Sequence, residues 1–200
     1  GPRGDPMERQ LTTAPHGHVL TNAGVWSPDG RWIVYDVRSD PAGAVFDGPR
    51  IERVHADTGE VQVLYQSRNG ACCGVVTGNP IDGRVVFILG PEHPTADWDY
   101  GPARRQGVIL DTSRPGEVVN LEARDLVPPF TRGALSGGTH LHTFAPNGRA
   151  VLFTYDDHVA GAANRRNVGV CLPGEAVIVP KTHPRNHDGT HYAMLLTRTD

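Results

Sequence analysis

The 200-residue chain has no cluster of basic residues, no long apolar run and only three cysteines. Its 19 lysines and arginines against 22 acidic residues give a net charge of −3. A nucleic-acid partner is therefore not expected, because no basic stretch could follow a phosphate backbone. No apolar segment reaches the roughly 20 residues of a membrane span. These absences exclude the nucleic-acid-binding and helical membrane classes.

The cysteines do not fit a secreted disulfide framework, because their number is odd and Cys72 and Cys73 are adjacent. We expect them and Cys171 to be reduced and partly buried. The N-terminal residues lack a basic segment followed by an apolar one, so we expect no secretory signal and a cytoplasmic location.

Long stretches of alanine, leucine, glutamate and lysine, which favour helices, are also missing. The 24 glycines and 17 prolines make up about a fifth of the chain instead. This composition favours many short strands joined by turns.

An internal repeat is built around a tight turn. Residues 26–35 read WSPDGRWIVY and residues 144–153 read FAPNGRAVLF, the same pattern position by position. Residues 79–87 are a third copy with one extra turn residue, and residues 186–196 are a degenerate fourth copy. Asp-Gly and Asn-Gly tolerate the positive φ of a hairpin turn. The aromatic and β-branched run that follows each turn is typical of a strand.

A second hairpin follows each of the first three copies, over residues 51–65, 107–121 and 167–179. Four strands per repeat predict an all-β propeller of four-stranded antiparallel blades. The predicted divisions are an N-terminal segment over 1–12, blades over 13–66, 67–123 and 124–180, and the start of a fourth blade over 181–200.

At WSPDGRWIVYD the chain resembles the TolB-type, WD-like propeller repeats. The wider run NAGVWSPDGRWIVYDVRSDPAG, with RIERV, GVVT and HPRNHDGTHY, resembles a bacterial propeller family of unknown function that is often labelled "biopolymer transporter Tol". The resemblance covers essentially the whole chain. It implies the propeller fold and says little about activity, because propellers host many activities.

The predicted ring is incomplete. Residues 9–12 (RQLT) are expected to form an outer strand that closes the ring onto the last blade. About three and a half blades are then present, fewer than the roughly four of a closed propeller. We expect the N-terminal part of a larger ring. The alternatives are self-association through open blade edges, or a four-bladed ring with a poor last blade.

The long connections are expected on one face. The turns within the repeated hairpins are short, whereas the other connections, over 37–49, 89–105, 124–138 and 156–166, are long. Connections alternate between the two faces of a blade, so the long ones gather together. Loops on a rigid scaffold commonly carry function, so this face is predicted to bind a small molecule or a protein.

Five of the ten histidines are predicted at one channel mouth on this face. His140 and His142 begin an inner strand, where residues i and i+2 point to one side, and His183 is at the equivalent position of the next repeat. His16 and His18 precede the first inner strand. We predict a divalent metal (Mn, Zn, Fe or Ni) on His140, His142 and His183. The alternative is that these histidines bond backbone groups or channel water.

Residues 137–142 are similar to the Gln-x-x-His-x-His pattern of the oligogalacturonate lyases, with Gly137 in place of the glutamine. That resemblance implies a metal that acidifies a C–H bond beside a uronate carboxylate.

Arg38, Asp40 and Arg185 are candidate substrate-binding residues, because a guanidinium can hold a carboxylate or a phosphate. The alternative for each is an ion pair or a contact that orders a loop. Trp98 and Tyr100 are loop aromatics that could stack on a sugar or pin the loop.

Two functions remain open. The first is a small-molecule binder with a histidine-built metal site, resembling a carbohydrate-acid lyase. The second is a TolB-like scaffold for a protein partner, without catalysis.

Overall fold

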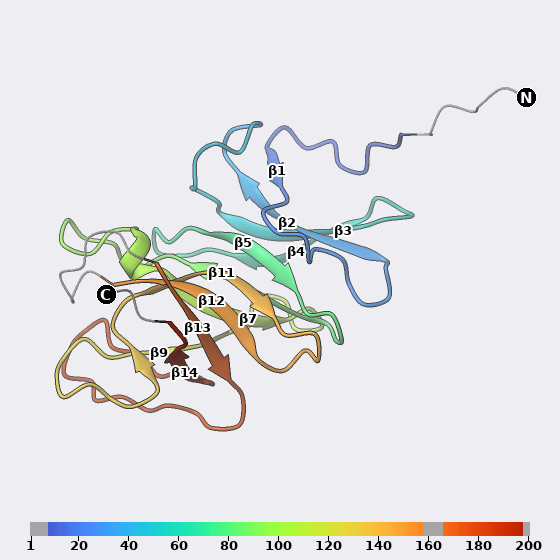
Figure 1. The fold of residues 1–200 in the computed structure, drawn as a ribbon. Coiled ribbons are helices and arrows are strands. Elements are labelled where there is room, and N and C mark those ends of the chain that lie inside the picture. Colours follow the sequence, from blue (N-terminus) through green and yellow to red (C-terminus); the bar gives the residue numbers. More distant parts are fainter. Residues whose placement is uncertain (1–7, 158–165, 198–200) are drawn as a thin grey trace, which may run out of the picture.

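The computed structural model describes residues 8–157 and 166–197, and three four-stranded antiparallel sheets dominate it (Figure 1). Each sheet has its strands in sequence order, from an inner strand to an outer one. The predicted all-β propeller of four-stranded blades is confirmed by these sheets. The only helix in the described ranges is a 3-10 turn over Pro102–Arg104, and no described helix is long and apolar enough to cross a membrane.

Blade 1 consists of β1 (Gly17–Val19), β2 (Trp32–Arg38), β3 (Arg50–His55) and β4 (Val61–Gln66). Blade 2 consists of β5 (Cys73–Gly78), β6 (Arg84–Leu89), β7 (Gln106–Asp111) and β8 (Val118–Asn120). The glycines of the predicted hairpin turns, Gly30 and Gly59, have φ values of 68° and 74°. Their positive φ explains why each turn needs a residue without a Cβ atom.

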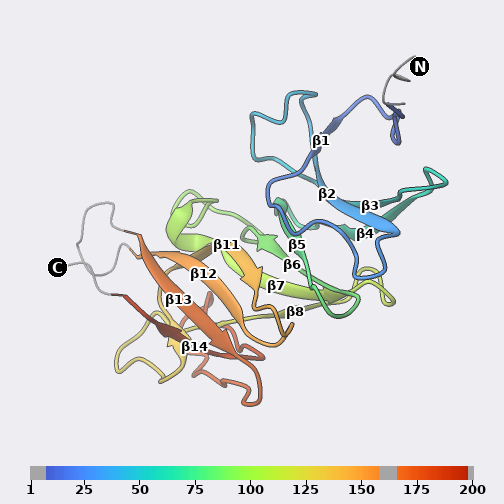
Figure 2. The ribbon, with the colours of Figure 1, turned by 45° about the vertical axis from the view of Figure 1, so that its right-hand side comes forward.

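Blade 3 differs from the predicted repeat. Its first three strands are β11 (Gly138–Phe144), β12 (Val151–Asp156) and β13 (Asn167–Leu172), and its outer strand is β14 (Tyr192–Leu195), which pairs with β13. Residues 175–179, expected as the outer strand, form only one isolated bridge, between Val177 and Gly189. Residues 192–195, expected in a fourth blade, therefore complete the third sheet instead (Figure 2).

Residues 192–195 can complete the third sheet because the segment between β13 and β14, residues 173–191, is long enough to fold on blade 2 before the chain returns. Backbone N–H groups of Thr190 and His191 donate to the carbonyls of Asn120 and Leu121, so the segment covers the outer edge of blade 2. We call residues 173–191 the insertion. A further parallel pair, β9 (Ala123–Arg124) and β10 (Ala134–Leu135), lies within the connection from blade 2 to blade 3.

Residues 9–12, expected to be a ring-closing strand, form no strand. Leu11 instead packs against the buried cluster of Tyr35, Val37 and Val54 on blade 1. Most of the predicted long loop over 156–166 lies outside the described residues.

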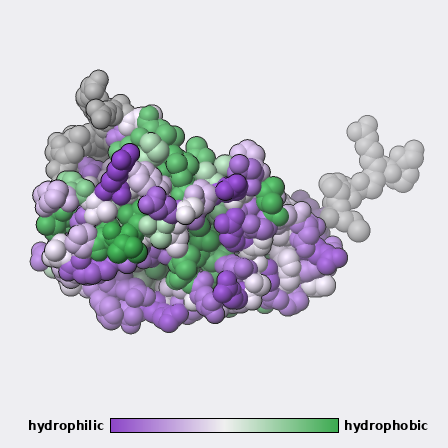
Figure 3. Space-filling view, turned by 90° about the horizontal axis from the view of Figure 1, so that it is seen from below, coloured by the Kyte–Doolittle hydropathy of each residue, from purple (hydrophilic) through white to green (hydrophobic). Residues whose placement is uncertain are grey.

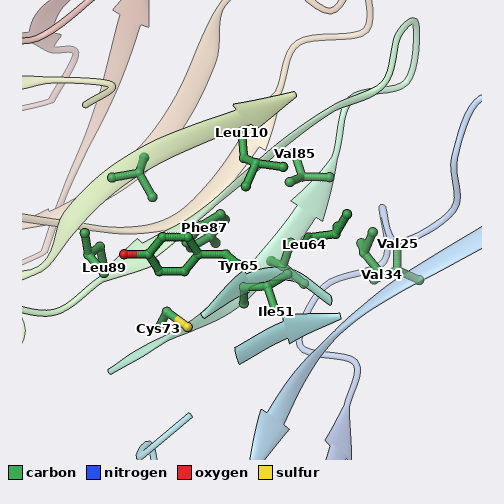
Figure 4. Close-up of a cluster of buried hydrophobic side chains, with 12 residues drawn as sticks. Val25, Val34, Ile51, Leu64, Tyr65, Cys73, Val85, Phe87, Leu89 and Leu110 are labelled. Carbon is green, nitrogen blue, oxygen red and sulfur yellow. The ribbon is translucent and has the colours of Figure 1, made fainter. Parts of the chain in front are cut away.

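The main core lies between blades 1 and 2 (Figure 4). Ile51 and Leu64 of blade 1 meet Cys73 and Phe87 of blade 2 there, and all four side chains are fully buried. A second core, between blades 2 and 3, surrounds Phe153. Fully burying a large apolar side chain contributes roughly 1.5–3 kcal/mol, so these cores fix the angle between neighbouring blades. Cys73 and Cys171 are buried and, like Cys72, form no disulfide.

A carboxylate also connects blades 1 and 2. Asp36 on β2 is fully buried and accepts the backbone N–H of Val75 (2.6 Å) and of Val76 (3.1 Å) on β5. Val75 has a φ of 58° and lies in a bulge of β5. The guanidinium of Arg38 completes this arrangement, 2.9 Å from the Asp36 carboxylate. Blade 1 thus supplies the hydrogen-bond acceptor for an irregular inner strand of blade 2.

Polar side chains cover most of the surface seen in Figure 3, and hydrophobic residues gather toward the middle of that face. Large apolar side chains are also exposed on the outer strands, among them Val63 on β4, Val119 on β8 and Met194 on β14.

Candidate ligand-binding site

A pocket of about 470 Å³ lies where the connection between β6 and β7 meets the insertion. Its walls come from five strands, β4 and β6 to β9, and from three other segments: the connections that follow β4 and β6, and the insertion. The lining residues are Tyr65, Arg68, Leu89, Gly90, Pro91, Glu92, His93, Trp98, Gln106, Val118, Asn120, Arg124, Pro184, Arg185, Asn186 and His187. None of them belongs to the inner strands β1, β5 and β11. The pocket is therefore built on the outer part of blade 2 and not at a channel mouth.

Arg185 joins the two segments that form the walls. Its two terminal nitrogens, Nη1 and Nη2, donate to the backbone carbonyls of Glu92 (2.7 Å) and His93 (2.8 Å). Its own backbone N–H donates to Nδ1 of His183 (3.0 Å). Neither acceptor of the guanidinium is a carboxylate, so the positive charge of Arg185 is not neutralised by these bonds.

The insertion is fixed to β9 at the base of the pocket. Arg124 and His187 exchange both of their backbone hydrogen bonds, at 2.9 and 3.1 Å. The Asn186 side chain donates to the Asp125 carboxylate (3.0 Å) and to the carbonyl of Pro180 (2.8 Å). The same amide accepts the backbone N–H of Leu126 at 2.9 Å. Because both polar atoms of the Asn186 amide are satisfied, it holds the insertion firmly against the segment that follows β9.

Trp98 lies among three guanidinium groups. The central carbons of Arg104, Arg124 and Arg185 lie 5.1, 5.6 and 5.9 Å from its ring centroid, within the range of cation–π contacts. Arg104 also forms an ion pair with Asp99. Within the described part of the chain, no ion pair involves Arg124 or Arg185.

Arg124 is the most buried of these cations, with 4% of its surface exposed. Nη2 donates to the carbonyl of Arg105 (2.8 Å), whereas Nε is buried without a partner. Burial lowers the pKa of Arg124, and Arg185 lowers it further, while Glu122 opposes both. A buried guanidinium without an ion pair is unusual, because desolvating a charge is costly unless an opposite charge compensates for it.

The pocket therefore has an excess of positive charge. Three arginines line it against the single carboxylate of Glu92. His187 remains neutral near pH 7, because burial and the charge of Arg124 lower its pKa to about 4. The amides of Gln106 and Asn120 add polar groups to the wall. This arrangement is suited to an anion with a flat or apolar portion that can lie against Trp98.

Of the predicted substrate-binding residues, Arg185 lines the pocket and Arg38 and Asp40 do not. Arg38 is buried and forms an ion pair with Asp36. The central carbon of its guanidinium lies 4.6 Å from the ring centroid of Phe46. The Asp40 carboxylate accepts the backbone N–H groups of Ala44 and Val45. Both side chains thus order the loop between β2 and β3, the alternative that was open from the sequence.

His140 and His142 do not follow the regular alternation of a strand. A bulge lies between His140 and Thr143, where Leu141 has a φ of 50°. An extra residue in a strand resets which face the next side chain occupies. His142 is therefore fully buried, with Nε2 2.7 Å from Oγ1 of Thr139, whereas His140 is only partly buried. Burial lowers their pKa values to about 4 for His140 and about 3 for His142.

His183 lies away from this strand, in the insertion, with its ring 6.1 Å from that of Trp98. The structure thus does not gather His140, His142 and His183 into one cluster. Among the described residues, one group of three potential metal ligands (His, Cys, Asp or Glu) has its ligand atoms within 4.8 Å of one another. This group is His16, His18 and Glu52.

Sequence reasoning singled out Trp98 and Arg185 but did not join them, and it missed Arg68 and Arg124. Trp98 stood out as an aromatic residue in a long loop, and Arg185 as a guanidinium that could hold a carboxylate or a phosphate. Arg124 carried no such signal, because a single arginine beside a predicted strand looks like an ordinary surface residue.

Comparison with known proteins places the chain in a family. Over 199 residues the chain is 47% identical to the uncharacterized protein YidR of Escherichia coli strain K12, covering 98% of this chain and 47% of that protein. The chain thus spans about half the length of this curated relative. A solved structure, TolB from Acinetobacter baumannii, superimposes with a TM-score of 0.46 at 16% identity, covering 74% of this chain and 28% of TolB.

A protein family of unknown function, DUF3748, matches residues 72–187. This range extends from blade 2 through blade 3 into the insertion and contains most of the pocket wall, including Trp98, Arg124 and Arg185. The chain belongs to the DUF3748 family.

Proposed function

We propose that this chain is the part of a β-propeller that binds a small organic anion, in the pocket between the β6–β7 connection and the insertion. The observation that carries the proposal is the buried guanidinium of Arg124, which has no ion pair among the described residues and lies beside the similarly unpaired Arg185. A carboxylate or phosphate would supply the missing charge.

The shape and lining of the pocket support a ligand of modest size. About 470 Å³ lies within the range of small-molecule sites. Trp98 offers a flat apolar surface, and Gln106 and Asn120 offer amides that can bond hydroxyl groups. A sugar acid or a sugar phosphate combines the three chemistries: an anionic group, hydroxyl groups and an apolar ring face.

The test is calorimetric titration with a matched ligand set, namely glucuronate, glucose 6-phosphate and uncharged glucose. We expect both anions to bind and glucose to bind at least ten-fold more weakly, because only the anions meet the guanidinium groups. Binding should weaken with added salt, since the contact is between charges. Equal binding of glucose and glucuronate would contradict the proposal, as would the absence of anion binding at about 10 mM.

Two variants separate the parts of the pocket. Arg124→Gln should weaken both anions about ten-fold or more, because it removes the buried charge. Trp98→Leu should weaken glucose 6-phosphate but leave inorganic phosphate nearly unchanged, since only the sugar ring reaches the indole. Arg114→Gln is the matched control, because Arg114 is exposed and lies outside this pocket. If no anion binds, the alternative function, a scaffold for a protein partner without catalysis, is favoured.

A further inference from the structure

A second cluster of polar side chains lies on blade 1, on the face turned away from blade 2. His16 and His18 flank Gly17 at the start of β1, and Glu52 projects from β3. Tyr35 on β2 shares this face with Val37 and Val54, which form their own buried cluster apart from the core between blades 1 and 2. None of these residues lines the anion pocket.

The backbone places the two imidazoles side by side. Gly17 pairs with Arg38 and His18 with Val37, so this segment is held as a strand against β2. A Cβ atom at position 17 would lie 2.3 Å from the carbonyl oxygen of Asp40, so only glycine permits this approach. The rings of His16 and His18 stack with a centroid distance of 4.4 Å and an interplanar angle of 26°.

Three ligand atoms converge in this cluster. One nitrogen from each imidazole and one oxygen of the Glu52 carboxylate lie within 4.8 Å of one another. Nε2 of His16 is 3.8 Å from Oε2 of Glu52, too far for a hydrogen bond, and it is buried without a hydrogen-bond partner. An unbonded buried nitrogen that faces a carboxylate oxygen at this distance leaves room for an ion between them.

The carboxylate is oriented by its neighbours. Glu52 is 4% exposed, and Oε2 accepts the hydroxyl of Tyr35 at 2.8 Å. Arg50 forms an ion pair with the other oxygen of Glu52, with Nε 3.1 Å from Oε1. Oε2 thus keeps a lone pair for a cation, while Tyr35 and Arg50 fix the plane of the carboxylate. Partners that hold a ligand in this way are typical of metal sites.

We propose that His16, His18 and Glu52 form a binding site for a divalent transition-metal ion, with zinc as the best match. Two imidazole nitrogens and one carboxylate oxygen are a common ligand set for zinc, and they leave a fourth tetrahedral position for water or another ligand. The site is independent of the proposed anion pocket, so either can fail without the other.

The experiment titrates Zn²⁺ into the chelator-treated chain and measures heat and bound metal, with Co²⁺ absorption reporting the geometry. We expect one ion per chain and tetrahedral Co²⁺ bands. His16→Ala/His18→Ala should lose at least 100-fold in affinity. Glu52→Gln, which keeps the size of the side chain, should lose at least ten-fold. Circular dichroism and thermal unfolding establish that each variant is folded.

A double variant with His93→Asn and His55→Ala is the matched control, because it removes two histidines outside the cluster and should bind Zn²⁺ like the parent chain. The proposal is overturned if the parent chain binds no stoichiometric Zn²⁺. It is also overturned if folded Glu52→Gln and the His16→Ala/His18→Ala variant both retain the parent affinity.

Discussion

The buried His142 makes a quantitative prediction about acid stability. Oγ1 of Thr139 donates to the Glu122 carboxylate (2.8 Å), so Nε2 of His142 must donate its proton to the same hydroxyl oxygen. Nδ1 is then the unprotonated nitrogen, and it is buried without a partner. Protonating His142 would place a charge in a fully buried site, which is why its pKa falls to about 3.

The sign follows from proton binding. Between about pH 6.5, the ordinary histidine value, and the folded value of about 3, the unfolded chain binds this proton and the folded chain does not. The stabilisation is therefore fully present above pH 6.5 and is lost as the pH falls toward 3. Each unit in this window costs about 1.4 kcal/mol, so His142 alone removes about 3 kcal/mol between pH 6.5 and pH 4.5.

The perturbation is His142→Val. Across the matching bulges, His142 is equivalent to Val76 in blade 2, which is also buried in the seam between blades. The variant should therefore fit the site and lose less stability than the parent when the pH is lowered. Urea unfolding at about pH 7 and about pH 4.5, followed by tryptophan fluorescence, gives the free energy of unfolding at each pH.

We expect the difference between the two pH values to be smaller by about 3 kcal/mol in His142→Val. His140 and His187, whose pKa values are lowered, and Glu122, whose pKa is raised, are present in both proteins. They affect each free energy of unfolding more than they affect the difference between His142→Val and the parent. His93→Asn is the control, because it removes an exposed histidine at a positive φ that asparagine tolerates. An unchanged pH dependence in His142→Val would refute the reasoning.

Two further predictions concern the seams between blades. Asp36→Ala should reduce the free energy of unfolding by about 3–5 kcal/mol, because it leaves the Val75 and Val76 amides and the buried Arg38 guanidinium without their acceptor. The control Asp40→Ala removes an exposed carboxylate and should reduce the free energy of unfolding by about 1 kcal/mol or less. Equal losses in the two variants, measured by chemical denaturation, would contradict this prediction. Gly107→Ala should cost about 1–3 kcal/mol, because its Cβ would lie 2.7 Å from both Oε2 of Glu122 and Nε2 of His142. The control is Gly101→Ala, which has open space around it and should keep the melting temperature of the parent. An unchanged melting temperature in Gly107→Ala would show that the seam is loosely packed and would contradict this prediction.

The propeller fold could be predicted because its signals are local. The Asp-Gly and Asn-Gly turns determine hairpins through φ, and the aromatic and β-branched run after each turn favours a strand. The structure shows both features, at the turn of Gly30 and along β2, whose residues 34–38 are all buried. The specific family label and the lyase resemblance remain predictions from those motifs.

The candidate site could be predicted only in part. Trp98 and Arg185 stood out as single residues, but 87 positions separate them in the sequence. Their meeting depends on the insertion returning across the edge of blade 2, which no repeat pattern encodes. The metal prediction on His140 and His142 assumed an unbroken strand, and the bulge at Leu141 changes the face that His142 occupies.

By itself, then, the sequence determined the hairpin turns and most strands of the three blades, because neighbouring residues set backbone conformation. Only the tertiary structure decided which strand completes blade 3, which histidines lie beside Glu52, and that Arg124 is a buried cation beside Trp98. Those outcomes depend on contacts between residues far apart in the chain. Such contacts are set by how blades pack and how long connections fold over them, and no short pattern contains that information.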